Sequence, residues 1–450
     1  SGASRGHRED CSAKENGMSE VTVGILGICA LFILFLTGIE MAFAMAFVGF
    51  VGYVILVSLK GATTMIVKDF FDTFASYAFT VIPLFVLMGQ ISFNAGIAKR
   101  LYNSANRFMG HIPGGLALAT VAGVTIFKTI CGSAAATNAT FASVAVPEMD
   151  RFEYSKKLST GIVAVSGTLG VLLPPSVVLI IFGMVTEQSI GKLFLAGLVP
   201  GVALAALFAA VIIGWCRINP AIGPRSTKHS WKEKLSSLPE VVWPLVIFVL
   251  MIGGLMGGVF TPTEAGSVGT LAVIILAIAK RDIGFGGIAK SLVECLRTAC
   301  MVLTLIACSA VLGHFIAVTN IPSIASDWVV SLPVHRSVIM IVIFLIYLVG
   351  GSIIDDLAFL ILATPIFFPA IIKLGYDPLW AGIMLCLTVV VGGVIPPVAM
   401  NVFIVKNITK VPIGVIYKGV YPFLISMILL IVLIFIFPQM VLYLPHTLMK

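Results

Sequence analysis

The sequence has 450 residues, of which 59% are hydrophobic and only 11% are charged, and its mean hydropathy is +1.11. Soluble domains carry about 25% charged residues, so this composition excludes a water-soluble globule and predicts an integral protein of the lipid bilayer. The formal net charge of +8 comes from lysines and arginines in the loops, which is the usual bias of membrane proteins and does not indicate a nucleic-acid partner.

The N-terminal part of the chain contains a polar segment followed by apolar runs. Residues 1–17 are polar and of mixed charge, and Met18 resembles a native start, so we interpret 1–17 as a tag or linker remnant. The apolar runs then predict membrane spans at 23–36, 41–59 and 79–91. The segment 98–109 places basic residues opposite apolar ones, which predicts an amphipathic helix at the membrane surface.

Two interrupted apolar segments follow. The segment 114–147 is interrupted at Gly132 and Ser133, and each arm is too short to span alone, which favours a re-entrant hairpin. The segment 159–184 is a full span that is broken by glycines and prolines within 167–175.

The second half repeats this plan after a basic loop at 216–238. A second hairpin is predicted at 338–371 and a second broken span at 381–405, in the same order as in the first half. The matching pairs are Gly132-Ser133 with Gly351-Ser352, Pro147 with Pro369, and Pro174-Pro175 with Pro396-Pro397. We therefore expect a first repeat at 18–215 and a second repeat at 239–450.

The predicted fold class is an all-α polytopic membrane protein with about 10–11 transmembrane helices and two re-entrant hairpins. The basic loops near Lys156, within 216–238 and near Lys406 should be cytoplasmic, so the first hairpin would enter from that side. The second hairpin is flanked by few basic residues and would enter from outside. The repeats are then inverted, and the hairpin tips meet the broken spans near the middle of the membrane.

Both breaks are rich in glycine, proline and small hydroxyl residues, and this pattern predicts a binding site. Backbone groups without partners in a bilayer cost several kcal/mol each unless they line a cavity or hold an ion. We therefore expect backbone carbonyls and hydroxyls to form the site. The alternative is a kink combined with a tight crossing of small residues.

Several motifs, in order, resemble the large membrane subunit of tripartite ATP-independent periplasmic (TRAP) transporters. They are GTLGVLLPPS at 167–176, TEQSIGKLF at 186–194, GLVPG at 197–201 and GVFTPTEA at 258–265. The resemblance covers residues 20 to 440. The sequence departs from the common pattern of that family at Ile395, Ala399 and Lys128.

The resemblance implies a multi-pass, elevator-type secondary transporter of the bacterial inner membrane. It would use a Na⁺ gradient to take up a small organic anion of the sialic acid or C4-dicarboxylate type. The expected partners are a small four-helix membrane subunit and a periplasmic substrate-binding protein. Two alternatives stay open, namely a related carrier that needs no binding protein and a channel whose broken helices form a selectivity filter.

Na⁺ prefers about five or six oxygen ligands, which carbonyls, hydroxyls and carboxylates supply. We expect at least two Na⁺ sites. The expected ligands of the first site are Gly132, Ser133, Thr137, Ser166, Gly167, Thr168 and Gly170. Those of the second site are Gly351, Ser352, Asp355, Gly392, Gly393 and Ile395. For Ser133 and Ser352 the alternative is a hydroxyl bonded to its own helix.

Five polar residues near the breaks are candidates for substrate contact, namely Lys128, Asn138, Ser176, Asp356 and Asn401. Lys128 could meet a substrate carboxylate, although snorkelling or pairing with an acid is an equal alternative. The two asparagines could instead hold helices together, and Asp356 could be solvated in a cavity.

The sequence contains no motif of an enzyme. The patterns His-Glu-x-x-His, Gly-x-Ser-x-Gly and Gly-x-x-x-x-Gly-Lys-Ser/Thr are all missing, so neither protease chemistry nor ATP hydrolysis is indicated. Glu264 follows Thr-Pro-Thr at a predicted helix start, where a role in capping the helix is favoured over proton coupling.

Overall fold

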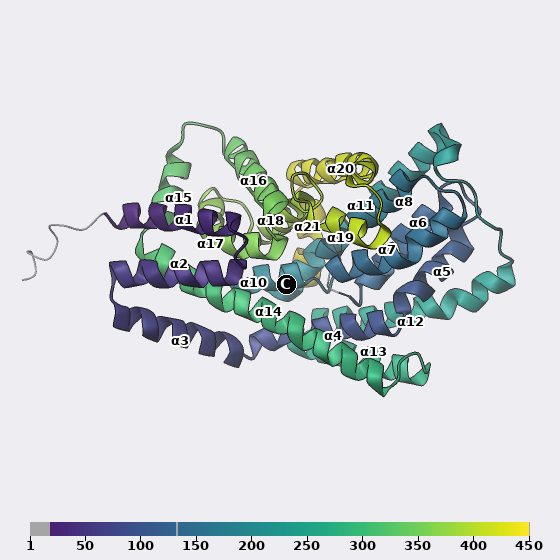
Figure 1. The fold of residues 1–450 in the computed structure, drawn as a ribbon, viewed down its shortest axis with the longest axis horizontal. Coiled ribbons are helices and arrows are strands. Elements are labelled where there is room, and N and C mark those ends of the chain that lie inside the picture. The colour runs from purple at the N-terminus through teal and green to yellow at the C-terminus, as the bar shows by residue number, and fades with distance from the viewer. Residues whose placement is uncertain (1–18, 132–133, 450) are drawn as a thin grey trace, which may run out of the picture. The chain divides into compact units, whose positions relative to one another are not determined.

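The computed structural model describes residues 19–131 and 134–449, and every regular element in these ranges is helical (Figure 1). Eight of the described helices are long and apolar enough to cross a membrane, or up to nine when the bent pair Lys156–Leu172 and Val177–Val185 counts as one span. The predicted all-α polytopic fold is therefore confirmed. The higher expectation of about 10–11 spans also counted shorter apolar helices, such as α1 (Glu20–Leu36) and α2 (Met41–Leu56).

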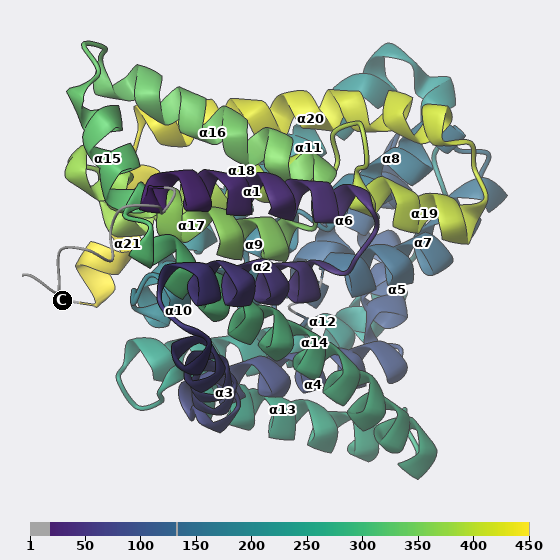
Figure 2. The ribbon, with the colours of Figure 1, turned by 60° about the vertical axis from the view of Figure 1, so that its left-hand side comes forward.

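The chain divides into two compact units, which are described separately. The first unit contains α1, α2, α3 (Leu59–Ala75), the C-terminal part of α14 (Phe285–Val318) and α15 (Ile321–Ser331). In it, α1 and α2 lie side by side as an antiparallel pair (Figure 2). The amphipathic α3 is joined to α14 by Asp69, whose Oδ1 lies 3.1 Å from Nε2 of His314.

The second unit begins with the helices of the predicted first repeat. These are α4 (Val81–Asn94), α5 (Ile97–Met109), α6 (Gly115–Lys128), α7 (Ala134–Arg151), α8 (Lys156–Ser166), α9 (Leu169–Leu172), α10 (Val177–Val185) and α11 (Ile190–Ile218). The arms of the first hairpin are α6 and α7, and its tip residues Gly132 and Ser133 lie outside the described residues. The first broken span is α8 to α10, with a bend of 41°.

The remaining helices of the second unit follow the same order. They are α12 (Trp231–Met256), α13 (Pro262–Ala279), the N-terminal part of α14, α16 (Arg336–Ile353), α17 (Asp356–Lys373), α18 (Pro378–Gly392), α19 (Met400–Thr409), α20 (Ile413–Ile436) and α21 (Gln439–Leu448). The predicted second hairpin corresponds to α16 and α17, each of which is also long enough to cross a membrane, and the predicted second broken span corresponds to α18 and α19. Both breaks contain a cis proline pair, Pro174-Pro175 in the first and Pro396-Pro397 in the second.

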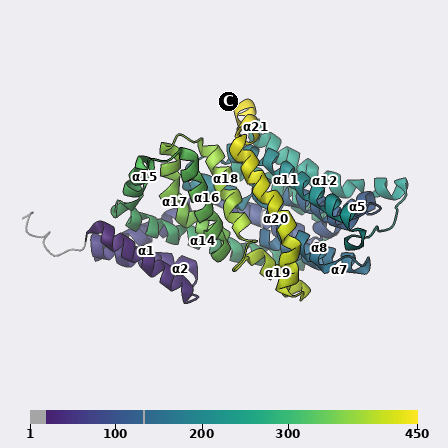
Figure 3. The ribbon, with the colours of Figure 1, turned by 90° about the horizontal axis from the view of Figure 1, so that it is seen from above.

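The two halves of the second unit interlock through the helices that follow the breaks. Helix α19 packs on α7 and α8, while α10 packs on α17 and α18. Helix α20 crosses α8 and lies beside α18 and α19 (Figure 3). The crossing is close because both helices carry glycine there, and a Cβ on Gly161 would lie 2.7 Å from Cα of Gly419. Each half therefore completes the packing of the other.

The base of the first hairpin is fixed by the turns around it. The Leu116 amide donates a hydrogen bond of 3.1 Å to the hydroxyl of Tyr154, which lies in the turn between α7 and α8. Burial raises the pKa of Tyr154 to about 12, so this hydroxyl stays protonated at physiological pH. The arms of the hairpin are thereby joined at the end opposite to its tip.

Candidate functional site

The first break is a fully buried segment between α8 and α10. The hydroxyls of Ser166 and Thr168 donate to the carbonyls three residues earlier, with lengths of 2.8 and 2.7 Å. Ser176 begins α10, and its Oγ accepts from the Leu179 amide at 3.4 Å. The three side chains therefore support the ends of helix segments inside the bilayer, where caps replace the missing ladder bonds.

Lys128 lies directly against this break. It is the last residue of α6, and none of its side chain is exposed. The ammonium lies over Gly170, where any Cβ would collide with Nζ. Within the described residues Nζ has no hydrogen-bond partner and forms no ion pair with a carboxylate. A buried ammonium without acceptors is costly, so this geometry suits an anionic ligand.

The second break is more open than the first. Pro396, Pro397 and Val398 are exposed, whereas Pro174 and Pro175 are buried. Ile395 is half-buried, and its amide donates to the Gly392 carbonyl at 2.9 Å. The second break therefore reaches the surface of the chain, whereas the first break is enclosed.

The tip of the second hairpin is bonded to this second break. The Ser352 carbonyl accepts from the amides of Val398 at 3.2 Å and Ala399 at 3.5 Å. Close approach is needed here, because a Cβ on Gly392 would lie 2.9 Å from the Ser352 amide nitrogen. Gly351 likewise faces the carbonyl of Val389. Glycine at 351 and 392 thus lets the hairpin and the broken span touch through their backbones.

Two predicted ligands of the second site have additional bonds in the structure. The Ser352 hydroxyl donates to the Val349 carbonyl at 2.7 Å. This is a bond to its own helix, which was the expected alternative to a role as a Na⁺ ligand. Asp355 is exposed and begins α17, and its Oδ1 accepts from the amides of Leu357 at 3.1 Å and Ala358 at 3.3 Å. Each of these oxygens retains further lone pairs.

Asn138 and Asn401 connect the two halves of the site. Nδ2 of Asn138 donates to Oδ1 of Asn401 at 2.9 Å, and both side chains are buried. Oδ1 of Asn138 has no partner within the described residues and lies against Gly167, where a Cβ would be 2.5 Å away. Nδ2 of Asn401 similarly lies against Gly393. The pair therefore places amide groups beside both breaks.

Some of the predicted residues are brought together and others cannot be placed. Lys128, Asn138, Gly167 and Gly170 meet at the first break, while Asn401 and Gly393 meet at the second. Thr137 is buried, with its Oγ1 4.0 Å from Sγ of Cys131. Gly132 and Ser133, predicted for the first Na⁺ site, lie outside the described residues.

Ala399 belongs to the site, although no motif in the sequence assigns it a function. Its φ of +49° places a residue with a side chain in the left-handed region that glycine adopts more easily. This conformation turns the chain into α19 and directs the Ala399 amide to Ser352. The departure from the family pattern at 399 was the available signal.

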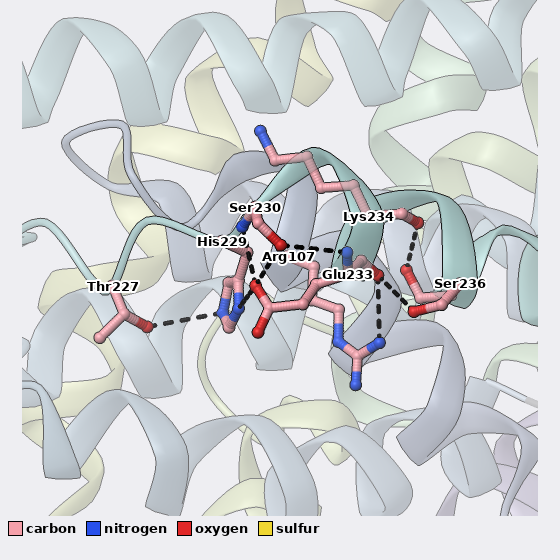
Figure 4. Close-up of polar contacts among 8 residues, drawn as sticks. Arg107, Thr227, His229, Ser230, Glu233, Lys234 and Ser236 are labelled. Carbon is pink, nitrogen blue, oxygen red and sulfur yellow. Dashed lines mark hydrogen bonds and ion pairs between the residues drawn. The ribbon is translucent and has the colours of Figure 1, made fainter.

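Two helix starts outside the site, those of α12 and α13, have a capping box. At α13, the Thr261 hydroxyl accepts from the Glu264 amide at 3.3 Å, and the Glu264 carboxylate accepts from the Thr261 amide at 2.8 Å. The capping role of Glu264 is confirmed. Ser230 and Glu233 make the same exchange at α12 (Figure 4).

Comparison with known proteins places the chain among transporters. Residues 28–440 match the family described as "Tripartite ATP-independent periplasmic transporter, DctM component". The C4-dicarboxylate TRAP transporter large permease protein DctM of Pseudomonas aeruginosa is 33% identical, over 88% of this chain and 92% of that protein. The sialic acid TRAP transporter large permease protein SiaM of Vibrio cholerae is 30% identical, over 92% of this chain and 96% of that protein.

The fold is similar to that of a solved transporter. The YdaH transporter of Alcanivorax borkumensis superposes with a TM-score of 0.52 at 15% sequence identity. The match covers 85% of this chain and 89% of that chain. At this identity the similarity concerns the fold alone.

Proposed function

Because the chain belongs to the DctM family of tripartite ATP-independent periplasmic transporters, it is a multi-pass permease of the bacterial inner membrane and not an enzyme, and we propose that it couples uptake of a small organic anion to a Na⁺ gradient. The observation that supports an anionic substrate is the buried Lys128 ammonium, which has no hydrogen-bond acceptor among the described residues. A substrate carboxylate would supply that acceptor. The two relatives above are both named for acids, which supports a carboxylate substrate.

The substrate contacts that we propose are Lys128, Asn138, Ser176, Asp356 and Asn401. Lys128 neutralises the carboxylate, and the unpartnered Oδ1 of Asn138 accepts from a substrate hydroxyl or amide. Asp356, at the start of α17, would accept a hydrogen bond from a hydroxyl or amide of the substrate.

The Na⁺ ions are proposed to bind where each hairpin tip meets its broken span. The first site would take oxygens from the hairpin tip and from Thr137, Ser166, Gly167, Thr168 and Gly170, and the second from Gly351, Ser352, Asp355, Gly392, Gly393 and Ile395. The bonds from Val398 and Ala399 to Ser352 support the second site, because they fix the tip carbonyl beside the break. Asp355 would add the one carboxylate of the second set.

The tripartite system supplies the remaining components. We propose that a small four-helix membrane subunit packs on the permease and that a periplasmic binding protein delivers the substrate. The interlocked hairpins and broken spans of the second unit would move together as an elevator, because each break is packed on a hairpin of the other half.

Uptake into proteoliposomes tests this function. The purified chain with its small subunit and binding protein should accumulate a labelled dicarboxylate or sialic acid under an imposed Na⁺ gradient. Equal uptake with K⁺ replacing Na⁺ on both sides would contradict Na⁺ coupling. Full uptake without the binding protein would favour the self-sufficient carrier, and ohmic currents without saturation would favour a channel.

A further inference from the structure

The end of α11, the start of α12 and the loop between them form a surface of unpaired positive charge. Its basic residues, which we call the basic surface, are Arg217 of α11, Arg225 and Lys228 of the loop, and Lys232 and Lys234 of α12. Arg217, Arg225, Lys228 and Lys232 are exposed, and Lys234 is partly exposed. Over the described ranges, none of them forms an ion pair with a carboxylate. The charge of this surface is therefore available to a ligand.

The one acid among these residues is already engaged. Oε2 of Glu233 accepts from the Ser230 amide at 2.7 Å and lies 3.4 Å from Nδ1 of His229 (Figure 4). The Glu233 carbonyl accepts from Arg107 of α5 at 3.2 Å, which holds the first turn of α12 in place. The side chain of Lys234 extends away from this carboxylate, and its Nζ lies 5.0 Å from the centre of the Trp231 ring.

Helix α12 is longer than the hydrocarbon core of a bilayer is thick. Its 26 residues span about 39 Å, whereas the core is ~30 Å thick, so roughly six residues have to lie beyond the core at its ends. Trp231 is 73% exposed and Leu235 is 61% exposed, although both are large and apolar. Tryptophan beside lysine is typical of a membrane interface.

The backbone that carries the basic surface is fixed by hydrogen bonds. The Ser226 amide donates to the Gly110 carbonyl at 2.8 Å, and the Gly114 amide donates to the Gly223 carbonyl at 2.8 Å. The Ser155 amide donates to the Ile222 carbonyl at 3.0 Å. The loop is thereby attached to the base of the first hairpin and to the start of the first broken span.

We propose that the basic surface binds the headgroup phosphates of anionic phospholipids. The positive charge provides the complementarity, and Trp231 and Leu235 insert beside the glycerol backbone, which a free phosphate ion could not exploit. A basic residue near an anionic membrane surface contributes about fivefold to affinity. Because the same loop holds the base of the first hairpin, the bound lipid anchors the region on which that hairpin rests.

Native mass spectrometry of the purified full chain tests this proposal. The probe is dioleoylphosphatidylglycerol, compared with dioleoylphosphatidylcholine and with inorganic phosphate. We expect retention of the anionic lipid only, and a loss of affinity on the order of 100-fold in the triple variant K228Q/K232Q/K234Q. The matched control K60Q/K290Q/K410Q removes the same charge from three other exposed lysines and should retain the lipid.

Three results would overturn the proposal. They are equal retention of the two lipids, equal loss in the two triple variants, and competition by inorganic phosphate at equal concentration. The variant W231A provides a second measurement that leaves the charges intact. This variant should bind the anionic lipid severalfold more weakly. An unchanged affinity would show that Trp231 does not contact the lipid.

Discussion

Asn138 and Asn401 are 263 residues apart in the sequence, yet Nδ2 of Asn138 donates a hydrogen bond of 2.9 Å to Oδ1 of Asn401. Asn138 lies in α7, the second arm of the first hairpin, and Asn401 lies in α19, the helix that follows the second break. A Cβ on Gly167 would lie 2.5 Å from Oδ1 of Asn138, and one on Gly393 would lie 3.4 Å from Nδ2 of Asn401, so the two amides fill the space beside both breaks. This hydrogen bond thus joins the two predicted repeats at the candidate site.

We expect Asn138→Ala and Asn401→Ala each to destabilise the protein by about 1–3 kcal/mol, because each leaves a buried amide without its partner. The double variant should lose less free energy of unfolding than the two single variants lose together, because the hydrogen bond between the two amides is lost only once. Thermal unfolding in detergent measures both effects. Ser143→Ala, an exposed position on the same helix, is the control and should change little. Additive costs would show that the bond contributes nothing.

Replacement of Lys128 tests the anion site. Lys128→Met keeps the aliphatic stem of the side chain and removes the ammonium, so KM for the anion should rise about 10- to 100-fold, as expected for loss of a charge-assisted bond. Sodium dependence of the remaining uptake should be unchanged. Lys157→Met, at an exposed lysine, is the control. An unchanged KM in the Lys128 variant would assign the ammonium to structure alone.

Removal of the Ser352 hydroxyl tests the second Na⁺ site. Ser352→Ala loses one proposed ligand and little volume, so the Na⁺ concentration for half-maximal uptake should rise severalfold. Ser426→Ala is a matched control, because its hydroxyl is also buried and also donates to a carbonyl three residues earlier. If the two variants respond equally to Na⁺, the Ser352 hydroxyl serves only its own helix.

The sequence predicts where the helices break, because each break combines a proline pair with glycines shortly before it. The breaks before Ser176 and Ala399 lie where these residues predict them. A single proline is a weaker signal, since Pro147, Pro200 and Pro422 lie inside continuous helices.

Side-chain partners follow a different logic, since they depend on how distant segments pack. Two contacts join segments that are far apart in the sequence, namely the bond of Asn138 to Asn401 and the position of Lys128 over Gly170. No short sequence motif predicts either contact.

The capping box of α13 predicts the outcome of changing Glu264. Glu264→Gln keeps an oxygen that can accept from the Thr261 amide, so we expect normal uptake and an unchanged response to external pH. Thr261→Ala loses the cap and should destabilise the helix by about 1 kcal/mol. Loss of uptake in a well-folded Glu264→Gln variant would instead support proton coupling at this carboxylate.

Cross-linking tests whether the site moves as one body. Tyr102 on α5 and Gly123 on α6 face each other, because a Cβ on Gly123 would lie 3.4 Å from Cα of Tyr102. In the elevator proposal α5 belongs to the frame or its connecting arm, whereas α6 belongs to the moving hairpin. A bridge between cysteines at 102 and 123 should therefore abolish uptake while leaving substrate binding measurable.

The matched bridge joins two parts of the proposed moving body. Phe182 on α10 and Phe368 on α17 have ring centres 5.5 Å apart, and they connect the first broken span to the second hairpin. If these elements travel together, their separation stays constant through the cycle, so a reducible cross-linker that joins cysteines at 182 and 368 should be tolerated. Reduction of either bridge should restore the rate of the unbridged variant. Full turnover with the bridge at 102 and 123, or arrest with only the bridge at 182 and 368, would replace the elevator with a local gate between the hairpins.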